Sequence, residues 1–392
     1  MVVDCINFTC LGESHKAVGK VCQDYSYSNI YEDGVAIAVV CDGHGGKRYF
    51  RSDIGARLAC QVTEEKTRLF IETVGDSLFK GKSYTANSAI ATQINNNQFE
   101  KENEIDKNLR QLFSSIIYEW SVRIQDHAEA TPLTEQELSS IEEGWQADFE
   151  SRTNLEKVYG CTLMAYIQTK DFWLAYHIGD GKCISFNAAG EWSEPIPWDE
   201  RCFLNKTTSL CDSNAIDEFR YCYQGDGNFP AAIFLGSDGL DDSFGSEENL
   251  ANFYVQILKK IVQVSKECVI EEIQTTLPEL SAIGSKDDMS VAMVFNQEAL
   301  TKVYPQLILW QINSVEKSLD KLNERIGKKR IKITELERLD SQTPQQQIEY
   351  DYACSDIDRM MVERAKIIKK INILSQELQG DKFTPYGVEK EA

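Results

Sequence analysis

The fold is decided by one short stretch, Val35-Ala36-Ile37-Ala38-Val39-Val40-Cys41-Asp42-Gly43-His44-Gly45-Gly46. Its apolar run predicts a buried strand, and the strand ends at Asp42. An acid at this place can bind a hard cation, and the glycines that follow let backbone approach a ligand closely. His44 can exchange a proton near neutral pH. Taken alone, the stretch is equally typical of an ordinary turn between a strand and a helix.

Three further acidic segments also lie beside apolar strands. They are Cys22-Gln23-Asp24, Gly236-Ser237-Asp238-Gly239 and Lys286-Asp287-Asp288-Met289-Ser290. Carboxylates gathered at one edge of a sheet repel each other, and a cation between them removes that repulsion. Ligands that offer only oxygen favour Mg²⁺ or Mn²⁺ over zinc. The sequence therefore predicts a hard-metal site, although each single Asp could instead be a turn or cap residue.

The composition is that of a folded protein with an acidic body. Of its 392 residues, 26% are charged and 42% are hydrophobic, and the net charge is −21. Residues 1–300 hold 25 basic and 47 acidic side chains, whereas residues 301–392 hold 16 and 15. Because an acidic surface repels nucleic acid, we expect no nucleic-acid partner. A phosphoprotein would be repelled too, so metals and local contacts must hold it.

Neither a membrane segment nor a disulfide framework is expected. No apolar run approaches the ~20 residues that a membrane helix needs. The start of the chain, Met1-Val2-Val3-Asp4-Cys5, has no basic segment followed by a long apolar core. The twelve cysteines form no Cys-x-x-Cys pair and several lie in apolar strands, which is typical of reduced, buried thiols. We therefore expect a cytoplasmic protein without a membrane partner.

The C-terminal part of the chain follows a different pattern. After Pro305, apolar residues step by four and three from Ile308 to Leu336, which is a heptad seam. The segment from Ser341 to Pro344 breaks this helix. We expect an antiparallel helical hairpin over residues 304–380 and a tail over 381–392. The hairpin either packs on the main domain or serves as an arm for a homodimer or another partner. The second helix of this hairpin is expected to have an apolar seam of its own, which consists of Ile357, Met361, Ile368, Ile371 and Leu378.

Six short motifs follow one another along the chain: Gln23-Asp24, Asp42-Gly43-His44-Gly45-Gly46, Gly160-Cys161-Thr162, Ile178-Gly179-Asp180-Gly181, Ser237-Asp238-Gly239 and Asp287-Asp288-Met289-Ser290. Taken in this order, they resemble those of the metal-dependent protein serine/threonine phosphatases of type 2C. The resemblance runs from about Phe8 to Phe295, and the segment from Ser14 to Asp24 is similar to the bacterial branch. It implies an α+β fold within residues 1–300, a four-layer α-β-β-α sandwich of two antiparallel sheets flanked by helices. The region between residues 80 and 155 is longer than the family pattern, so we expect an insertion there.

The resemblance also assigns roles to the acids around two metal ions. It implies that Asp42 bridges two Mg²⁺ or Mn²⁺ ions and that the Gly43 carbonyl is a further ligand. Asp24 is expected to act largely through a bound water. Two ions that share one water can supply both the nucleophile and the neutralising charge that phosphate-ester hydrolysis needs.

The remaining metal ligands implied by the resemblance lie later in the chain. Of the two ions, Asp238 and Asp287 are expected to bind the one that is not mainly bound by Asp24. Asp287 is chosen over Asp288 because it comes first in the Asp-x-Met-Ser pattern. Asp180 matches a position that can hold a third, weaker ion together with Asp238, although Asp-Gly is also an ordinary hairpin turn.

His44 is the candidate general acid for the leaving alkoxide, a role worth roughly 10²–10⁴ in rate. Many relatives have an Arg upstream of the first Asp to hold the substrate phosphate. The segment from Gly12 to Asp24 contains no Arg. Lys16, Lys20 and His15 are the candidates to replace this Arg. Each would donate a single hydrogen bond to the phosphate, whereas an Arg guanidinium donates two in a fixed geometry.

The expected function is metal-dependent hydrolysis of phosphoserine and phosphothreonine on proteins. A phosphoprotein substrate and a cognate Ser/Thr kinase are the expected partners. One alternative is a catalytically weak or inactive sensor or scaffold that binds a phosphoprotein and signals through the hairpin. Another is a hydrolase of small phosphoesters. The four mutually repelling carboxylates favour an enzyme over a scaffold, because a scaffold has no need to keep them.

Overall fold

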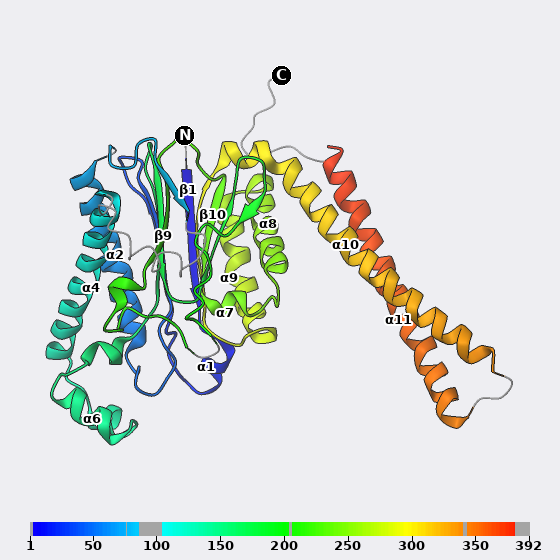
Figure 1. The fold of residues 1–392 in the computed structure, drawn as a ribbon, viewed down its shortest axis with the longest axis horizontal. Helices are drawn as coiled ribbons and strands as arrows, with labels where there is room; N and C mark the ends of the chain where they lie inside the picture. The colour runs from blue at the N-terminus through cyan, green and yellow to red at the C-terminus, as the bar shows by residue number, and fades with distance from the viewer. Residues whose placement is uncertain (1–2, 76, 86–103, 204–205, 340–342, 381–392) are drawn as a thin grey trace, which may run out of the picture. The chain divides into compact units, whose positions relative to one another are not determined.

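The structure is a computed structural model that describes residues 3–75, 77–85, 104–203, 206–339 and 343–380. The chain divides into two compact units, Met1–Thr301 and Lys302–Ala392. The first unit contains two antiparallel sheets with helices on their outer faces, and the second contains a pair of long helices (Figure 1). No helix in the described ranges combines the length and the apolar character needed to span a bilayer.

One sheet of the first unit has, among the described residues, five strands in the order β1-β11-β10-β7-β8. Every pairing in it is antiparallel. The strands are β1 (Val3–Cys10), β7 (Lys182–Phe186), β8 (Trp192–Ser193), β10 (Ala232–Gly236) and β11 (Met289–Asn296).

The second sheet has six strands within the described ranges, in the order β2-β3-β5-β6-β9-β4, and is also antiparallel. Its second strand, β3, is the apolar run that ends at Asp42, and all six of its residues are buried. The strands are β2 (Tyr25–Ile30), β3 (Ala36–Cys41), β4 (Ser83–Thr85), β5 (Leu163–Gln168), β6 (Trp173–Ile178) and β9 (Arg220–Gln224).

The two faces of β3 enter two different cores. Ala36, Ala38 and Val40 belong to the apolar cluster that also contains Ile233 and Leu235 of the other sheet. The alternate residues, from Ile37 to Cys41, belong to the cluster formed with the helices that cover the six-stranded sheet. A strand that is buried on both faces reads as a continuous apolar run, which explains why the sequence pattern was so clear.

Helices cover the outer face of each sheet. α2 (Ser52–Val74) and α4 (Glu104–Ala130) lie over the six-stranded sheet, and α8 (Glu247–Gln263) and α9 (Lys266–Ile283) lie over the five-stranded sheet (Figure 1). The predicted α-β-β-α sandwich is thereby confirmed. The shorter helices are α1 (Glu13–Ala17), α5 (Glu135–Ser139), α6 (Glu143–Glu150), η2 (Leu155–Tyr159), α7 (Asp238–Asp241) and η3 (Ala215–Asp217).

The region of the expected insertion contributes α4 to the helical layer. The apolar face of this helix is buried, and the indole Nε1 of Trp120 donates a 3.0 Å hydrogen bond to the Gly55 carbonyl of α2. The short strand β4, which pairs with β9, was not predicted. Residues 86–103, where part of the insertion was expected, lie outside the described residues.

The second unit contains most of α10 (Gln297–Glu337) and all of α11 (Pro344–Leu378). Ion pairs join Lys329 to Asp356 and Lys332 to Glu349, so the two helices run antiparallel as predicted. The predicted seam of α11 was wrong at two positions: Met360 and Ile367 pack with Leu322 and Ile326 of α10, where Met361 and Ile368 were expected. Met360 is 4% exposed and packs against α10, whereas Met361 is 37% exposed. The seam steps from Ile357 by three residues rather than four.

Candidate metal centre and active site

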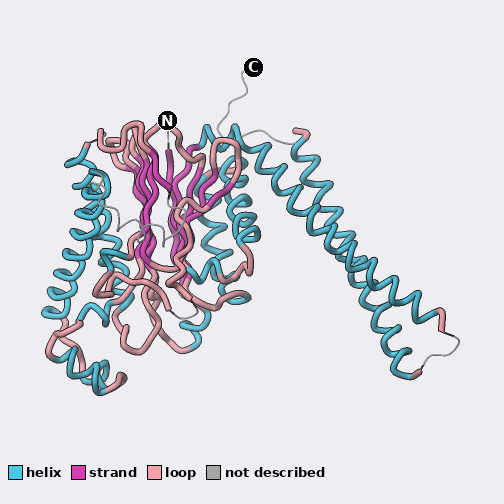
Figure 2. The backbone as a smooth tube through the Cα atoms, viewed as in Figure 1, coloured by secondary structure: helices cyan, strands magenta, loops and turns pink. Residues whose placement is uncertain are grey.

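The strand register brings two of the predicted metal ligands to the same end of one sheet. Tyr25 of β2 is paired with Cys41 of β3, so Asp24 and Asp42 lie next to each other just beyond the ends of these strands. The backbone of Asp42 is fixed by Thr162, whose hydroxyl accepts a 3.0 Å hydrogen bond from the Asp42 N–H. Loops gather at this end of the strands (Figure 2).

The other acids reach the same place from the facing sheet. Gly236 at the end of β10 is paired with Lys182 at the start of β7. Asp238, in the first turn of α7, and Asp180, in the turn before β7, therefore lie at the same end. Asp287 comes just before β11, which pairs with β10. The structure thus brings together all five carboxylates that the sequence assigned to metal ions.

Burial and mutual repulsion raise the pKa values of four of these carboxyl groups, those of Asp24, Asp42, Asp180 and Asp238. Burial, followed by the charges of Asp24 and Asp238, raises the pKa of Asp42 well above its usual range. Burial and the charge of Asp288 do the same to the pKa of Asp24. Burial and the charge of Asp238 raise the pKa of Asp180 to about 6. A cation bound here would remove the repulsion and lower these pKa values.

Two further observations show that the residues fit a hard cation. The Asp24 Oδ2 atom is buried without a hydrogen-bond partner, and such a buried acceptor is costly unless a ligand satisfies it. A side chain at Gly43 would lie 2.4 Å from the Gln23 carbonyl oxygen and 2.8 Å from that of Ser52, so only glycine fits beside the acids. The clustered carboxylates and the Gly43 carbonyl thus offer closely packed oxygen atoms, which are the ligands that Mg²⁺ and Mn²⁺ prefer.

Asp287 and Asp288 have different environments although they are adjacent. The Asp288 carboxylate is buried and accepts hydrogen bonds of 2.6 Å from the backbone N–H groups of Gly12 and Gln23. The Asp287 side chain is exposed, which is expected of a residue that binds an ion accessible to the substrate. Oxygens of both carboxylates and a ring nitrogen of His15 lie within 4.8 Å of one another. Asp288 thus holds the loops that carry the acids, and Asp287 remains the proposed ligand.

His44 is enclosed beside the acids. Its Nε2 lies 2.7 Å from the Ser209 hydroxyl, and its ring packs edge-on against Tyr49 at 4.8 Å between ring centroids. Its carbonyl accepts hydrogen bonds from Gln23 and Ser52. Burial lowers the pKa of His44 to about 4, so the imidazole is neutral at pH 7 in the metal-free chain. A substrate phosphate would be the charge that favours its protonation.

The three candidates for phosphate binding are placed differently. The Lys20 ammonium lies 3.5 Å from the Gly45 carbonyl oxygen, within the Asp42–Gly46 loop. Lys16 is largely exposed and pairs with Glu13. The Nδ1 atom of His15 lies 3.0 Å from the Asp288 carboxylate. Lys20 is therefore the candidate that contacts the loop of Asp42 directly.

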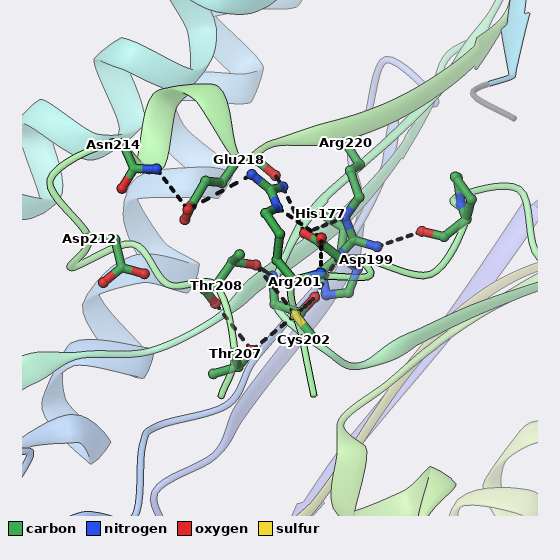
Figure 3. Close-up of polar contacts among 12 residues, drawn as sticks. His177, Asp199, Arg201, Cys202, Thr207, Thr208, Asp212, Asn214, Glu218 and Arg220 are labelled. Carbon is green, nitrogen blue, oxygen red and sulfur yellow. Dashed lines mark hydrogen bonds and ion pairs between the residues drawn. The ribbon is translucent and has the colours of Figure 1, made fainter. Parts of the chain in front are cut away.

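A buried polar network supports the turn that carries Asp180 (Figure 3). The Arg220 guanidinium donates to the Gly179 carbonyl at 2.5 Å, to the Pro197 carbonyl at 2.6 Å and to His177 Nδ1 at 2.9 Å. The Gly179 N–H donates to the Thr208 hydroxyl at 2.9 Å. The N–H and the carbonyl of Gly179 are thus both fixed, and Asp180 is the next residue.

Asp199 balances the charge of this network. One of its oxygens lies 3.5 Å from Arg220 Nε and 2.7 Å from an Arg201 nitrogen. Arg201 in turn donates to the Glu218 carbonyl at 3.1 Å. The loop between β8 and β9 is therefore anchored to the same arginine that fixes the Asp180 turn. Sequence analysis did not find these residues, because no motif marks them and their contacts depend on the fold.

Comparison with known families identifies the chain. The family model described as protein phosphatase 2C matches residues 11–278, more than half of the chain. The protein belongs to this family. Among curated proteins, no significant match was found.

Several solved structures are similar in fold. The serine/threonine phosphatase of S. agalactiae is 14% identical, with 75% of this chain and 99% of that chain covered and a TM-score of 0.44. Stp1, a serine/threonine phosphatase from Staphylococcus aureus, is 12% identical, with coverage of 76% and 96% and a TM-score of 0.44. A C. elegans sex determining protein is 14% identical, with coverage of 77% and 68% and a TM-score of 0.47.

Proposed function

We propose that this protein is a metal-dependent phosphatase that hydrolyses phosphoserine and phosphothreonine esters on proteins. The single observation that carries the proposal is the cluster of carboxylates between the two sheets. Asp42 lies close enough to Asp24, Asp238 and Asp180 for each of their charges to raise its pKa. A chain that had lost the need for a cation would gain stability by replacing any of them.

The proposed metal ligands are the carboxylates of Asp42, Asp24, Asp238 and Asp287 and the Gly43 carbonyl, with Asp180 serving a third ion. When bound, Mg²⁺ or Mn²⁺ supplies an acidified water as the nucleophile and neutralises phosphate charge. The protein's own part is to hold these oxygens together. Thr162 fixes Asp42, and Asp288 fixes the residue before Asp24.

His44 is proposed to protonate the leaving alkoxide of the serine or threonine. Its neighbour Ser209 orients the ring through Nε2. Because burial keeps His44 neutral before substrate arrives, the proton must come with the bound phosphate or be taken up when the phosphate dianion binds. Lys20 is proposed to hold a phosphate oxygen as a single-point donor, with Lys16 and His15 as weaker candidates.

The proposed partners and location follow from the chemistry of the chain. A phosphatase of this kind acts on a phosphoprotein that a Ser/Thr kinase has modified. All twelve cysteines are free thiols, nine of them buried, as in proteins that fold in a reducing compartment. We therefore propose a cytoplasmic location.

The test is release of phosphate from a phosphothreonine peptide by the purified full-length protein, with Mn²⁺ and then with EDTA. Turnover that requires Mn²⁺ and is lost in Asp42→Asn supports the proposal. No turnover by a folded protein that binds Mn²⁺ would overturn it in favour of the scaffold function. Hydrolysis of a small aryl phosphate but of no phosphopeptide would favour the small-phosphoester alternative.

A further inference from the structure

The short helices α5 and α6, which lie within the expected insertion, pack against the residues that follow the Asp42–Gly46 loop (Figure 1). Phe149 of α6 is buried and meets Phe50 edge-on, with 6.4 Å between the ring centroids. Arg51 donates to both carboxylate oxygens of Glu137 in α5, at 2.8 and 3.0 Å. The insertion therefore forms a wall beside the loop that carries His44, and we call α5 and α6 the insertion wall.

Arg48 lies at the junction between this loop and the insertion wall. Its guanidinium carbon is 4.6 Å from the centroid of the Tyr49 ring and 5.1 Å from the centroid of the Trp145 ring. A guanidinium nitrogen also donates a hydrogen bond to the Tyr49 hydroxyl. Contacts between a guanidinium and aromatic faces are favourable, and two of them restrict where the side chain can lie. Arg48 is therefore held in place before any substrate binds.

The charge of Arg48 is not balanced by a carboxylate. Within the described residues, neither Arg48 nor its neighbours Lys20 and Lys47 form an ion pair. All three surround the glycines of the loop, since the Lys20 ammonium is 3.5 Å from the Gly45 carbonyl oxygen and the other two directly follow Gly46. Acidic side chains outnumber basic ones by 47 to 25 in residues 1–300. Three unpaired cations at one loop of such a domain form a local site of attraction for an anion.

Tyr49 connects Arg48 to the proposed general acid. Its ring packs against the His44 imidazole at 4.8 Å between centroids, and the Arg48 guanidinium lies over the same ring. His44 is proposed to contact the serine or threonine oxygen, so Arg48 is one aromatic ring away from the phosphorylated residue. An extended peptide advances ~3.3 Å per residue, so a side chain about one to three positions from the phosphorylated residue can reach Arg48.

We propose that Arg48 selects phosphoproteins that carry an acidic side chain about one to three positions from the phosphorylated serine or threonine. This inference rests on the proposed phosphatase function and names its substrate class. A guanidinium can donate two parallel hydrogen bonds to a carboxylate, and within the described residues Arg48 donates only to Tyr49. The insertion wall gains a role as well, because Trp145 holds the selecting residue in place.

The test compares KM values for three phosphothreonine peptides in Mn²⁺, which carry flanking Glu, Ala or Lys residues. The wild-type protein should have a KM for the Glu peptide at least ~10-fold below that for the Lys peptide. Arg48→Glu should reverse this order, which a merely structural role of Arg48 would not do. Arg48→Met keeps an apolar stem against Trp145 and should remove most of the difference. The matched control Lys107→Glu makes the same charge change at an exposed position of α4 and should keep the wild-type order.

The outcomes separate this inference from the proposed function. Hydrolysis of none of the three peptides by the wild-type protein would overturn both, whereas hydrolysis of all three with equal KM values would overturn this inference alone. A preference for Glu that survives Arg48→Glu would also overturn it. A small aryl phosphate has no flanking residues. If Arg48→Met raised its KM as much as that of the Glu peptide, Arg48 would bind the phosphate itself and the inference would be wrong.

Discussion

The Asp288 carboxylate accepts a 2.6 Å hydrogen bond from the backbone N–H of Gln23, 265 residues earlier in the chain. Its other oxygen accepts a hydrogen bond of the same length from the Gly12 N–H. This one buried side chain therefore connects the start of β11 to the loop that leads into Asp24. The loops that carry the proposed metal ligands Asp24 and Asp287 are thus held together by Asp288, which is not itself a proposed ligand.

Asp288→Ala should lower the free energy of unfolding by ~1–3 kcal/mol for each buried N–H that it leaves without an acceptor. The adjacent variant Asp287→Ala is the matched control. Because the Asp287 side chain is exposed, its loss should change stability in EDTA by no more than ~0.5 kcal/mol. Urea denaturation in EDTA measures both. Equal destabilisation by the two variants would contradict the different roles given to these neighbours.

In the metal-free protein, the contribution of the clustered carboxyl groups to stability should fall as pH rises, whereas the lowered pKa of buried His44 contributes in the opposite direction. The pKa values of Asp24, Asp42, Asp180 and Asp238 are raised in the folded state, for Asp180 to about 6, so these groups bind more protons in the folded chain than in the unfolded chain above pH ~4. Their contribution is then greatest below the unfolded pKa and is lost as pH rises through the folded pKa. Mn²⁺ should reverse this trend, because it stabilises the deprotonated acids. Thermal unfolding from pH 4.5 to 7.5 with and without Mn²⁺ tests the sign.

Asp42→Asn should make the metal-free protein more stable at pH 7, because it removes one of several repelling charges. The same variant should lose the stabilisation that Mn²⁺ gives to the wild-type protein. A melting temperature in EDTA below that of the wild-type protein would show that the Asp42 charge is not repelled in the folded state.

Arg220→Met should lower the free energy of unfolding by ~1–3 kcal/mol for each buried carbonyl that it leaves without a donor, those of Gly179 and Pro197, whereas Asp199 keeps its pair with Arg201. Arg68→Met is the control, since Arg68 pairs with the half-exposed Asp33 at the surface and such pairs contribute ~0–1 kcal/mol. Chemical denaturation of both variants measures the difference. A loss below ~1 kcal/mol for Arg220→Met would contradict the anchoring role of this network.

His44→Gln should lower kcat by roughly 10²–10⁴ without changing Mn²⁺ affinity, because a general acid contributes to the chemical step and is not a ligand. Steady-state kinetics and a calorimetric Mn²⁺ titration separate the two effects. A variant with normal kcat would remove His44 from the chemistry.

The features that sequence analysis predicted correctly are those whose signal is local. β3 and β10 are short apolar runs that end beside an acid, so both the strand and the place of the acid could be inferred from neighbouring residues. The break between the hairpin helices was marked by Thr343-Pro344, and the structure shows a capping box of Thr343 and Gln346 at the start of α11.

The features that were missed depend on contacts between distant segments. The role of Asp288 requires Gly12 and Gln23, and the partner of His44 is Ser209, 165 residues away. The choice of Met361 over Met360 failed because two adjacent methionines both fit a heptad, and only packing against Leu322 and Ile326 decides between them.

The most direct test of the central claim is a calorimetric titration of Mn²⁺ into the full-length protein at pH 7. Asp171→Asn, at an exposed turn away from the carboxylates, is the control for a simple loss of one charge. We expect the wild-type protein and the control to bind two ions and Asp42→Asn to bind fewer. Equal binding by all three proteins, or no binding by the wild-type protein, would contradict the assignment of these carboxylates to a metal centre.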